Sequence, residues 1–268
     1  MKRICLFFIF VLNYLSINAQ TAPDTFIIQT NIGTMKGILY ADMPNHVKAF
    51  KERANAGKFN GTLFTRVING FMIQGGSPDS RNAAPGARCG YGDRSAEIMP
   101  ENRTLHFHKK GALASPRQND DINPKKKSDT SQFYIVQGRT YRSGELDTLE
   151  LIKNIPIRKK AIAKYYTPIR PEMLKLKESN PAEFKIRMKE VKARIDSTLR
   201  ATPGHLFFTE EQRQAYTTVG GCHSLDGEYT VFGEVTEGLD IIDKIARQPK
   251  DRYDRPTKDI RIIKVTIK

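Results

Sequence analysis

In one stretch of the chain a single charged side chain interrupts a run of apolar residues. The stretch is GTLFTRVINGFMIQGG at positions 61–76, with Arg66 near its middle and Gln74 near its end. Arginine is almost never fully buried without a partner. Arg66 therefore either points outward from an alternating strand or belongs to a site that requires a guanidinium. A guanidinium held in a fixed position donates strong hydrogen bonds and stabilises charge that develops during a reaction.

Other residues that could support catalysis or ligand binding lack the spacing that their chemistry needs. His106 and His108 would share one face of a strand, but no third metal ligand accompanies them. Cys89 and Cys222 could form a disulfide in an exported protein, and two free thiols are the alternative, because a single pair does not specify contact. The double glycine that ends the 61–76 run lacks the lysine and helix start of a phosphate loop. We therefore expect neither a metal nor a cofactor.

The first 19 residues have the pattern of a secretory signal peptide. Lys2 and Arg3 precede an apolar run at 4–17, and the small residue Ala19 ends a short polar stretch. The run is too short for a comfortable membrane span. We expect cleavage after Ala19 and an exported protein, periplasmic or in the cell envelope if the source is bacterial, with no stable membrane insertion afterwards.

The chain is strongly basic, with a formal net charge of +15 over 268 residues. Such a charge is typical of nucleic-acid-binding proteins, but export argues against that partner. Attraction to acidic surfaces is the more modest inference, and it includes anionic lipid, cell-wall polymer and acidic polypeptide. The sequence leaves the oligomeric state open.

Short alternating segments dominate the rest of the chain and predict many strands. A helix is expected from Pro44 to a stop at Gly57, and a second short helix at 238–246. Strands are expected at 25–40 as a hairpin, 61–76, 104–108, 111–115, 131–137, 229–235 and 259–267. Many strands with two short helices favour an antiparallel barrel or sandwich.

The composition changes between residues 139 and 220, where 17 Lys and Arg accompany 10 Asp and Glu. Asn180, Pro181 and Glu183 form a helix start, and Thr209–Gln212 forms a capping box. From Phe184 to Leu199, apolar residues keep one face for about four turns. We predict a basic helical insertion at 139–220 within a domain that spans 24–268. Its basic face is either simply solvated or a binding surface.

Three separated motifs show a resemblance to a known family. FTRVINGFMIQGGSP, SQFYIVQG and LDGEYTVFGEVTEGLDIIDKI resemble the cyclophilin family of peptidyl-prolyl cis–trans isomerases, and the similarity covers 25–139 and 221–268. The resemblance implies a mainly β fold, a closed eight-stranded antiparallel barrel capped by two helices. It also places the predicted insertion beside the substrate groove. We expect the insertion to form a small helical subdomain at the rim of that groove.

The resemblance also assigns roles to particular residues. Arg66 corresponds to the catalytic arginine that projects into the substrate groove, and Gln74 to the glutamine that orients it. The family pattern also implies the residues of a proline pocket and groove, which are Phe71, Met72, Arg117, Gln132, Tyr134, Leu225 and Tyr229.

Several positions depart from the family pattern. Ser224 replaces a frequent tryptophan, Tyr229 a histidine, and Pro116 a usual alanine at the edge of the groove. The change at Tyr229 is compatible with activity. Arg117 keeps its backbone available beside Pro116, but we expect Pro116 to stiffen the groove edge. We therefore expect an exported isomerase that speeds folding of proline-containing polypeptides. The alternative is a non-catalytic peptide-binding or chaperone module that uses the same groove.

Overall fold

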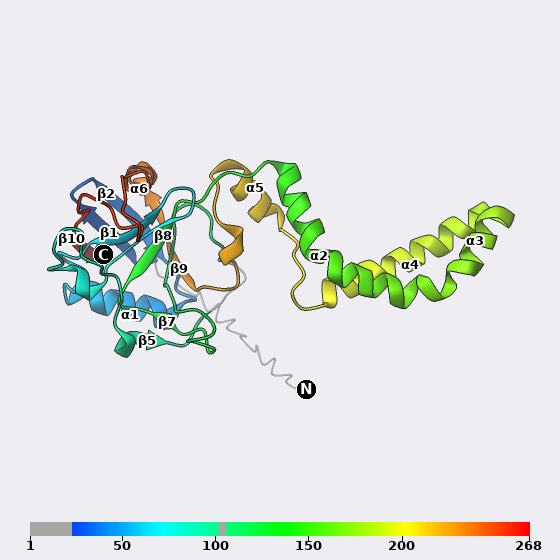
Figure 1. Cartoon of the computed structure of the whole chain (residues 1–268), viewed down its shortest axis with the longest axis horizontal. Helices are drawn as coiled ribbons and strands as arrows, with labels where there is room; N and C mark the ends of the chain where they lie inside the picture. The colour runs from blue at the N-terminus through cyan, green and yellow to red at the C-terminus, as the bar shows by residue number, and fades with distance from the viewer. Residues whose placement is uncertain (1–22, 102–105) are drawn as a thin grey trace, which may run out of the picture.

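A computed structural model describes residues 23–101 and 106–268 of the chain as a curled β-sheet domain from which a long helical arm projects (Figure 1). The main sheet has eight strands in the order β10-β1-β2-β9-β6-β8-β4-β3, and all of its described pairings are antiparallel. The strands are β1 (Thr25–Thr30), β2 (Thr34–Leu39), β3 (Phe64–Ile68), β4 (Met72–Gly75), β6 (Ala112–Ala114), β8 (Phe133–Val136), β9 (Val231–Glu237) and β10 (Ile262–Ile267).

The sheet curls until its two ends approach each other. β3 and β10 lie at opposite ends of the strand order, and the flanking residues Leu63 and Arg261 form an isolated antiparallel bridge. No ladder joins the two strands along their length within the described residues. The predicted eight-stranded antiparallel sheet is confirmed, whereas closure into a barrel is not.

The core is apolar because alternate residues of each strand face inward, as in β1, where Phe26 and Ile28 are fully buried. Two helices pack on this core: α1 (Pro44–Asn55) lies against β9 and β10, and α6 (Leu239–Ala246) lies against β2, β3 and β4. Both helices were expected from the sequence. Pro44 occupies the first turn of α1, and Gly57 follows its end with φ of +65°.

Helix α1 has no side-chain cap of its own, because Met43 stands at its N-cap. Glu101 supplies the cap from a distant loop by accepting hydrogen bonds from the backbone N–H groups of Asn45 (3.1 Å) and His46 (3.0 Å). The ring Nδ1 of the buried His46 lies 2.6 Å from the same carboxylate. Burial opposes ionisation of Glu101, but the hydrogen bonds outweigh it and lower the pKa of this carboxyl.

Residues between β8 and β9 form four helices: α2 (Ser143–Tyr165), α3 (Arg170–Ser179), α4 (Pro181–Ala201) and α5 (Glu210–Thr218). The two helix starts expected from the sequence are present. Asn180 accepts from the Glu183 N–H at 3.2 Å, and Thr209 and Gln212 form a reciprocal capping box. Helix α2 was not anticipated. It carries Pro156 in its interior and is bent in Figure 1, as expected where a proline removes a helical hydrogen bond.

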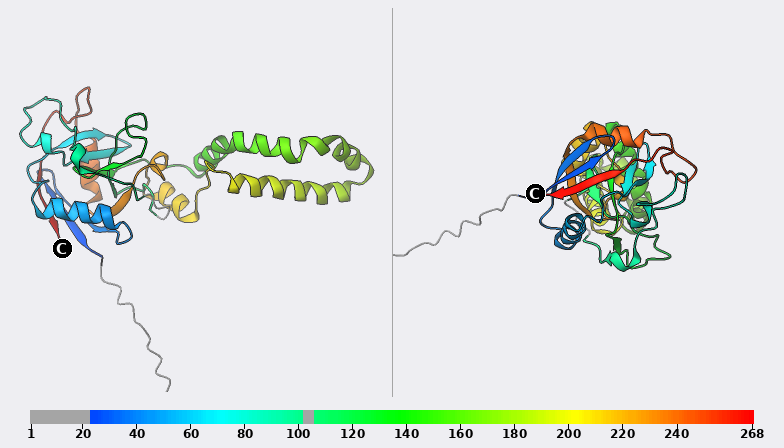
Figure 2. Two further views of the ribbon diagram at one scale, coloured as in Figure 1. Left: turned by 90° about the horizontal axis from the view of Figure 1, so that it is seen from below. Right: turned by 90° about the vertical axis from the view of Figure 1, so that its left-hand side faces the viewer.

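We call residues 143–201, which hold α2, α3 and α4, the arm. Figures 1 and 2 show the arm extending away from the sheet domain, with α2 and α4 running side by side. The prediction of a small helical subdomain at the groove rim is therefore wrong for the arm. The start of α2, at Leu146, and helix α5 pack beside the sheet domain through a small core of Phe107, Tyr141, Leu146, Phe208 and Tyr216.

The strands β5 (Glu97–Ile98) and β7 (Ser128–Asp129) pair in a second, two-stranded sheet that the sequence did not predict. The predicted strand at 104–108 is not formed at 106–108, and its first two residues lie outside the described part of the chain, as does the predicted signal peptide at 1–19. Within 23–101 and 106–268, no helix is long and apolar enough to cross a membrane.

Candidate active site

Arg66 lies on β3 directly opposite Gln74 on β4, in the hairpin that turns at Asn69-Gly70. Gly70 has φ of +77°, which an L-residue adopts only at a cost, and this turn fixes the register of the two strands. Arg66 is the exposed residue of β3, and 45% of its side chain is accessible. Its Nε lies 3.6 Å from Oδ2 of Asp254. The sequence placed Gln74 as the partner that orients the guanidinium, but among the described residues the neighbouring charge is Asp254.

Beside Arg66 lies a small hollow of about 80 Å³. The structure brings together nearly all of the site residues that the sequence suggested, and the lining is Arg66, Phe71, Met72, Gln74, Pro116, Arg117, Tyr134, Leu225 and Tyr229. Met72, Tyr134 and Leu225 are buried and belong to one apolar cluster, with Phe71 and Tyr229 packed against it. The Tyr134 and Tyr229 rings meet edge to face with centroids 5.9 Å apart. The hollow therefore offers an apolar wall opposite a guanidinium.

Gln132 stands outside the lining but holds Gln74 in place. The side-chain amide of Gln74 donates to Oε1 of Gln132 at 3.0 Å, and the amide of Gln132 donates to Oδ2 of Asp129 at 2.8 Å. Gln132 and Asp129 are both buried. This chain of hydrogen bonds fixes which end of the Gln74 amide is the donor, and it leads from the hollow back to the short strand β7.

The side chain of Arg117 ties the two walls of the groove together. Its guanidinium donates to the carbonyl of Glu228 at 3.1 Å and to the Glu228 carboxylate at 3.1 Å, and it also pairs with Asp120. It lies over the Tyr229 ring, 4.8 Å from the centroid, with only 7% of the side chain exposed. Lys126 adds a second cation 2.5 Å from Glu228. The resemblance placed Arg117 at the groove but assigned no role to its side chain, and these contacts give it one.

A buried polar network connects the hollow to the predicted insertion. The Tyr134 hydroxyl lies 2.9 Å from Nε2 of His108, and Nδ1 of His108 lies 3.0 Å from Oδ1 of Asp226. Tyr216 on α5 donates to Oδ2 of Asp226 at 2.5 Å. Burial raises the pKa of both tyrosines, so their hydroxyls keep the protons that they donate. Because Asp226 follows Leu225 directly, the network reaches the wall of the hollow at two points.

The remaining candidates from the sequence do not meet in the structure. His106 pairs with Asp42 at 2.8 Å and stacks on Tyr40, while His108 is engaged in the network. No group of three potential metal ligands occurs within 23–101 and 106–268. Cys89 and Cys222 are separate free thiols, and burial raises the pKa of each.

Sequence reasoning missed Asp254, Asp129 and Tyr216. Asp254 has φ of +63°, in a region that few non-glycine residues occupy, yet nothing in the surrounding letters RYDRP distinguishes it. Asp226 belongs to the LDG motif and could have been noted there. Its partner His108 is 118 residues away in the sequence, so only the fold shows the contact.

Comparison with known proteins agrees with this geometry. Residues 25–154 and 172–267 match the family model described as cyclophilin type peptidyl-prolyl cis-trans isomerase/CLD. A putative peptidyl-prolyl cis-trans isomerase of Staphylococcus saprophyticus is 28% identical over 258 residues, covering 95% of this chain and 98% of the relative. One from Staphylococcus epidermidis is 26% identical with the same coverage.

Solved structures show the same fold. A cyclophilin type peptidyl-prolyl cis-trans isomerase of Cryptosporidium parvum, crystallised in the presence of the dipeptide Ala-Pro, superposes with a TM-score of 0.51 at 18% identity, covering 91% of this chain and 98% of that one. A second structure of that protein gives a TM-score of 0.52 at 17% identity, with 92% and 98% covered. The chain belongs to the cyclophilin family of peptidyl-prolyl cis–trans isomerases.

Proposed function

We propose that this isomerase accelerates X-Pro isomerisation while exported proteins fold, with Arg66 as the catalytic group. The observation that carries the proposal is the position of the Arg66 guanidinium at an apolar hollow of about 80 Å³. The hollow would hold the proline ring, with Met72 as an adaptable wall.

The physical reason for this assignment is the nature of the barrier. The peptide C–N bond has partial double-bond character, and rotation about it costs about 18–20 kcal/mol. In the twisted amide the nitrogen regains its lone pair and becomes a hydrogen-bond acceptor. A guanidinium that donates to this nitrogen, and also holds the preceding carbonyl, stabilises the twisted state more than either planar isomer. Asp254 would keep the Arg66 side chain in place for this purpose.

Gln74 would contact the backbone of the substrate. Its amide nitrogen is already bonded to Gln132, which supports an acceptor role for its oxygen toward a substrate N–H. The reaction breaks no covalent bond and transfers no proton. We therefore expect a rate that is nearly constant between about pH 6 and 8, where an unperturbed histidine would titrate.

The test is a protease-coupled assay on short X-Pro peptides with wild type, Arg66→Ala and Arg66→Lys. Loss of a preorganised donor typically costs about 10²–10³ in rate, so Arg66→Ala should lower kcat/KM by at least about a hundredfold. Arg66→Lys should recover little, because an ammonium lacks the planar fork. An unchanged rate in a folded Arg66→Ala variant would falsify the mechanism, and it would favour the non-catalytic peptide-binding alternative.

Export is tested separately. The expected signal peptide predicts that protein recovered from its native source begins at Gln20. N-terminal sequencing of that protein, together with cell fractionation, measures this directly. A protein that retains residues 1–19 inside the cell would contradict the export part of the proposal and leave the catalytic part untouched.

A further inference from the structure

The outer part of the arm is the most basic region of the molecule. Residues 151–201 contain 14 Lys and Arg but only 5 Asp and Glu, a net charge of +9 out of +15 for the whole chain. The acidic residues near the start of α2 lie outside this segment. The arm therefore presents concentrated positive charge at a distance from the sheet domain (Figure 1).

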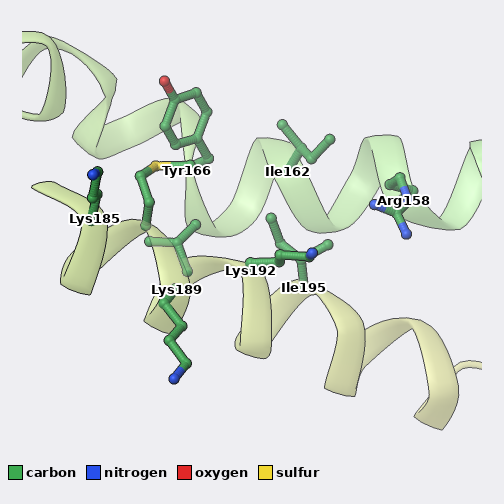
Figure 3. Close-up of a pocket in the computed structure, with 9 residues that line it drawn as sticks. Arg158, Ile162, Tyr166, Lys185, Lys189, Lys192 and Ile195 are labelled. Carbon is green, nitrogen blue, oxygen red and sulfur yellow. The ribbon is translucent and has the colours of Figure 1, made fainter. Parts of the chain in front are cut away.

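The same part of the arm carries an apolar groove between α2 and α4, with a volume of about 520 Å³ (Figure 3). Ile162 on α2 and Met188 and Ile195 on α4 contribute its apolar surface. Lys185, Lys189 and Lys192 border it, with aliphatic stems that extend the apolar walls and ammonium groups that remain in water.

The groove exists because α2 and α4 pack side by side in the arm as a single layer. Val191 and Ile195 are buried against α2 together with Ala161, but a pair of helices cannot cover both sides of its apolar contact. Ile162 is 37% exposed as a result. Exposed apolar surface that is bordered by polar side chains marks an interaction site more often than scattered single residues do.

Among the residues that the structure describes, the lysines at the groove have no acidic partners of their own. Lys185, Lys189 and Lys192 make no ion pair with any residue in 23–101 or 106–268, whereas Arg158 on the opposite wall pairs with Asp196 at 3.6 Å. On another part of α4, Arg187 is paired with Glu172. Unpaired cations are thus gathered where the apolar groove opens.

We propose that this groove docks a segment of the substrate polypeptide in which apolar side chains are flanked by Asp and Glu. The apolar side chains would enter the groove, and the carboxylates would pair with its lysines. The volume lies within the range of about 300–1,000 Å³ of pockets that enclose ligand groups, which suits inserted side chains better than a flat lipid surface. A second arm would bring another +9 of like charge, which opposes self-association.

The inference rests on the proposed function, because it gives the folding substrate a second point of attachment. Helix α2 has 23 residues, or about 35 Å at 1.5 Å per residue before its bend is considered. A segment held in the groove would keep the following chain tethered near the proline site at a high effective concentration. Acidic unfolded chains would therefore be isomerised faster than their affinity for the proline site alone predicts.

The test uses the full chain and a fluorescent dodecapeptide without proline, in which Leu and Phe are flanked by Asp and Glu. One control peptide replaces the Leu and Phe by Ser, and another replaces the acids by Asn and Gln. Fluorescence anisotropy should detect binding of the first peptide only. This binding should weaken on going from 0.1 M to 1 M salt, as the Debye length falls from about 10 Å to about 3 Å.

Variants locate the binding. K185E/K189E/K192E and, separately, Met188→Asp should each weaken binding of the peptide by at least about tenfold, with helix content unchanged by circular dichroism. The matched control, K153E/K175E/K177E, makes the same charge change at exposed arm lysines outside the groove and should weaken it by less than about threefold. Equal loss in the two triple variants would show a diffuse charge effect and would overturn the groove as a site.

Two further measurements exclude other occupants, and one separates the inference from the proposed function. The chain could bind vesicles of anionic lipid through Met188 and fail to bind the peptide. That result would overturn the proposal in favour of a membrane. A dimer in sedimentation that Met188→Asp dissociates would overturn it in favour of a second copy. Tetrapeptide isomerisation is measured for every variant. Normal isomerisation without peptide binding refutes only this inference, whereas peptide binding without isomerisation supports it and refutes the proposed function.

Discussion

The buried network between α5 and the hollow gives a quantitative prediction for the change Tyr216→Phe. Tyr216 is fully buried, so phenylalanine fills the same space and removes only the hydroxyl that donates to Asp226 at 2.5 Å. Hydrogen bonds to charged groups are worth about 1.5–3 kcal/mol. We expect the free energy of unfolding in urea to fall by about this amount.

The same change should also affect catalysis, through His108. With its proton on Nδ1, His108 donates to Asp226 and accepts from the Tyr134 hydroxyl, so Asp226 orients the imidazole that holds a wall of the hollow. When Tyr216 no longer fixes Asp226, the hydrogen bond between His108 and Tyr134 should contribute less to catalysis. Tyr134→Phe should therefore cost less kcat/KM in the Tyr216→Phe background than in wild type.

A double-mutant cycle on kcat/KM measures this coupling. Residues within one hydrogen-bond network show interaction energies of about 0.5–3 kcal/mol, whereas independent sites add within about 0.3–0.5 kcal/mol. Tyr141→Phe is the matched control, because Tyr141 contacts the Tyr216 ring in the same aromatic cluster but makes no described bond to Asp226. If Tyr216→Phe and Tyr134→Phe prove additive, the network does not support the hollow and this reasoning fails.

Two other contacts predict separate effects. In steady-state kinetics, Arg117→Ala should raise KM for X-Pro peptides with little change in kcat, because Tyr229 loses the cation that lies over it. Arg117→Lys should not restore the wild-type KM. Burial lowers the pKa of His46 from 6.5 despite the nearby Glu101 carboxylate, so below about pH 6.5 the unfolded chain binds a proton that the folded chain refuses. Urea titrations should show stability falling as the pH drops below about 6.5 toward the folded pKa of His46, and His46 contributes at most about 1.4 kcal/mol per pH unit to this slope. His46→Gln should reduce the slope, and an unchanged slope would contradict this role of His46.

The sequence was informative wherever the determining signal is local. The hairpin at Asn31–Gly33, the start of α1 at Pro44 and the capping of α4 by Asn180 each depend on residues within one turn of one another. The site motif around Arg66 is also local, because the register of one hairpin sets Arg66 opposite Gln74. Features that depend on such short-range contacts can be predicted from the sequence without knowledge of the fold.

What the sequence did not predict depends on contacts between distant segments. Helix α2 contains Pro156 and has a weak apolar stripe, so its stability comes from packing along α4 rather than from its own residues. The charge beside Arg66 comes from Asp254, more than 180 residues further along the chain. The small core around Tyr216, from which the arm projects, joins residues as distant in sequence as Phe107 and Phe208, so no local periodicity predicts it.

These contacts also decide how the role of the arm can be tested. Deletion of the whole segment 139–220 would remove Tyr216 together with the arm, so it would disturb the hollow and could not isolate docking. Ala161 and Ile195 are buried in one cluster across the two helices, which makes them suitable ends for a shorter link. Replacement of residues 162–194 by a short Gly/Ser turn removes the groove but keeps α5 and its contacts.

We expect this shortened chain to isomerise tetrapeptides at a rate within about twofold of wild type, because Tyr216, Asp226 and the hollow are retained. Its catalysis of the proline-limited refolding of an acidic protein should fall, and the salt dependence of that catalysis should disappear with the removed lysines. A basic protein with a proline-limited refolding step is the control and should respond little. If refolding of both proteins falls in proportion to tetrapeptide turnover, the arm only supports the fold and does not capture substrates.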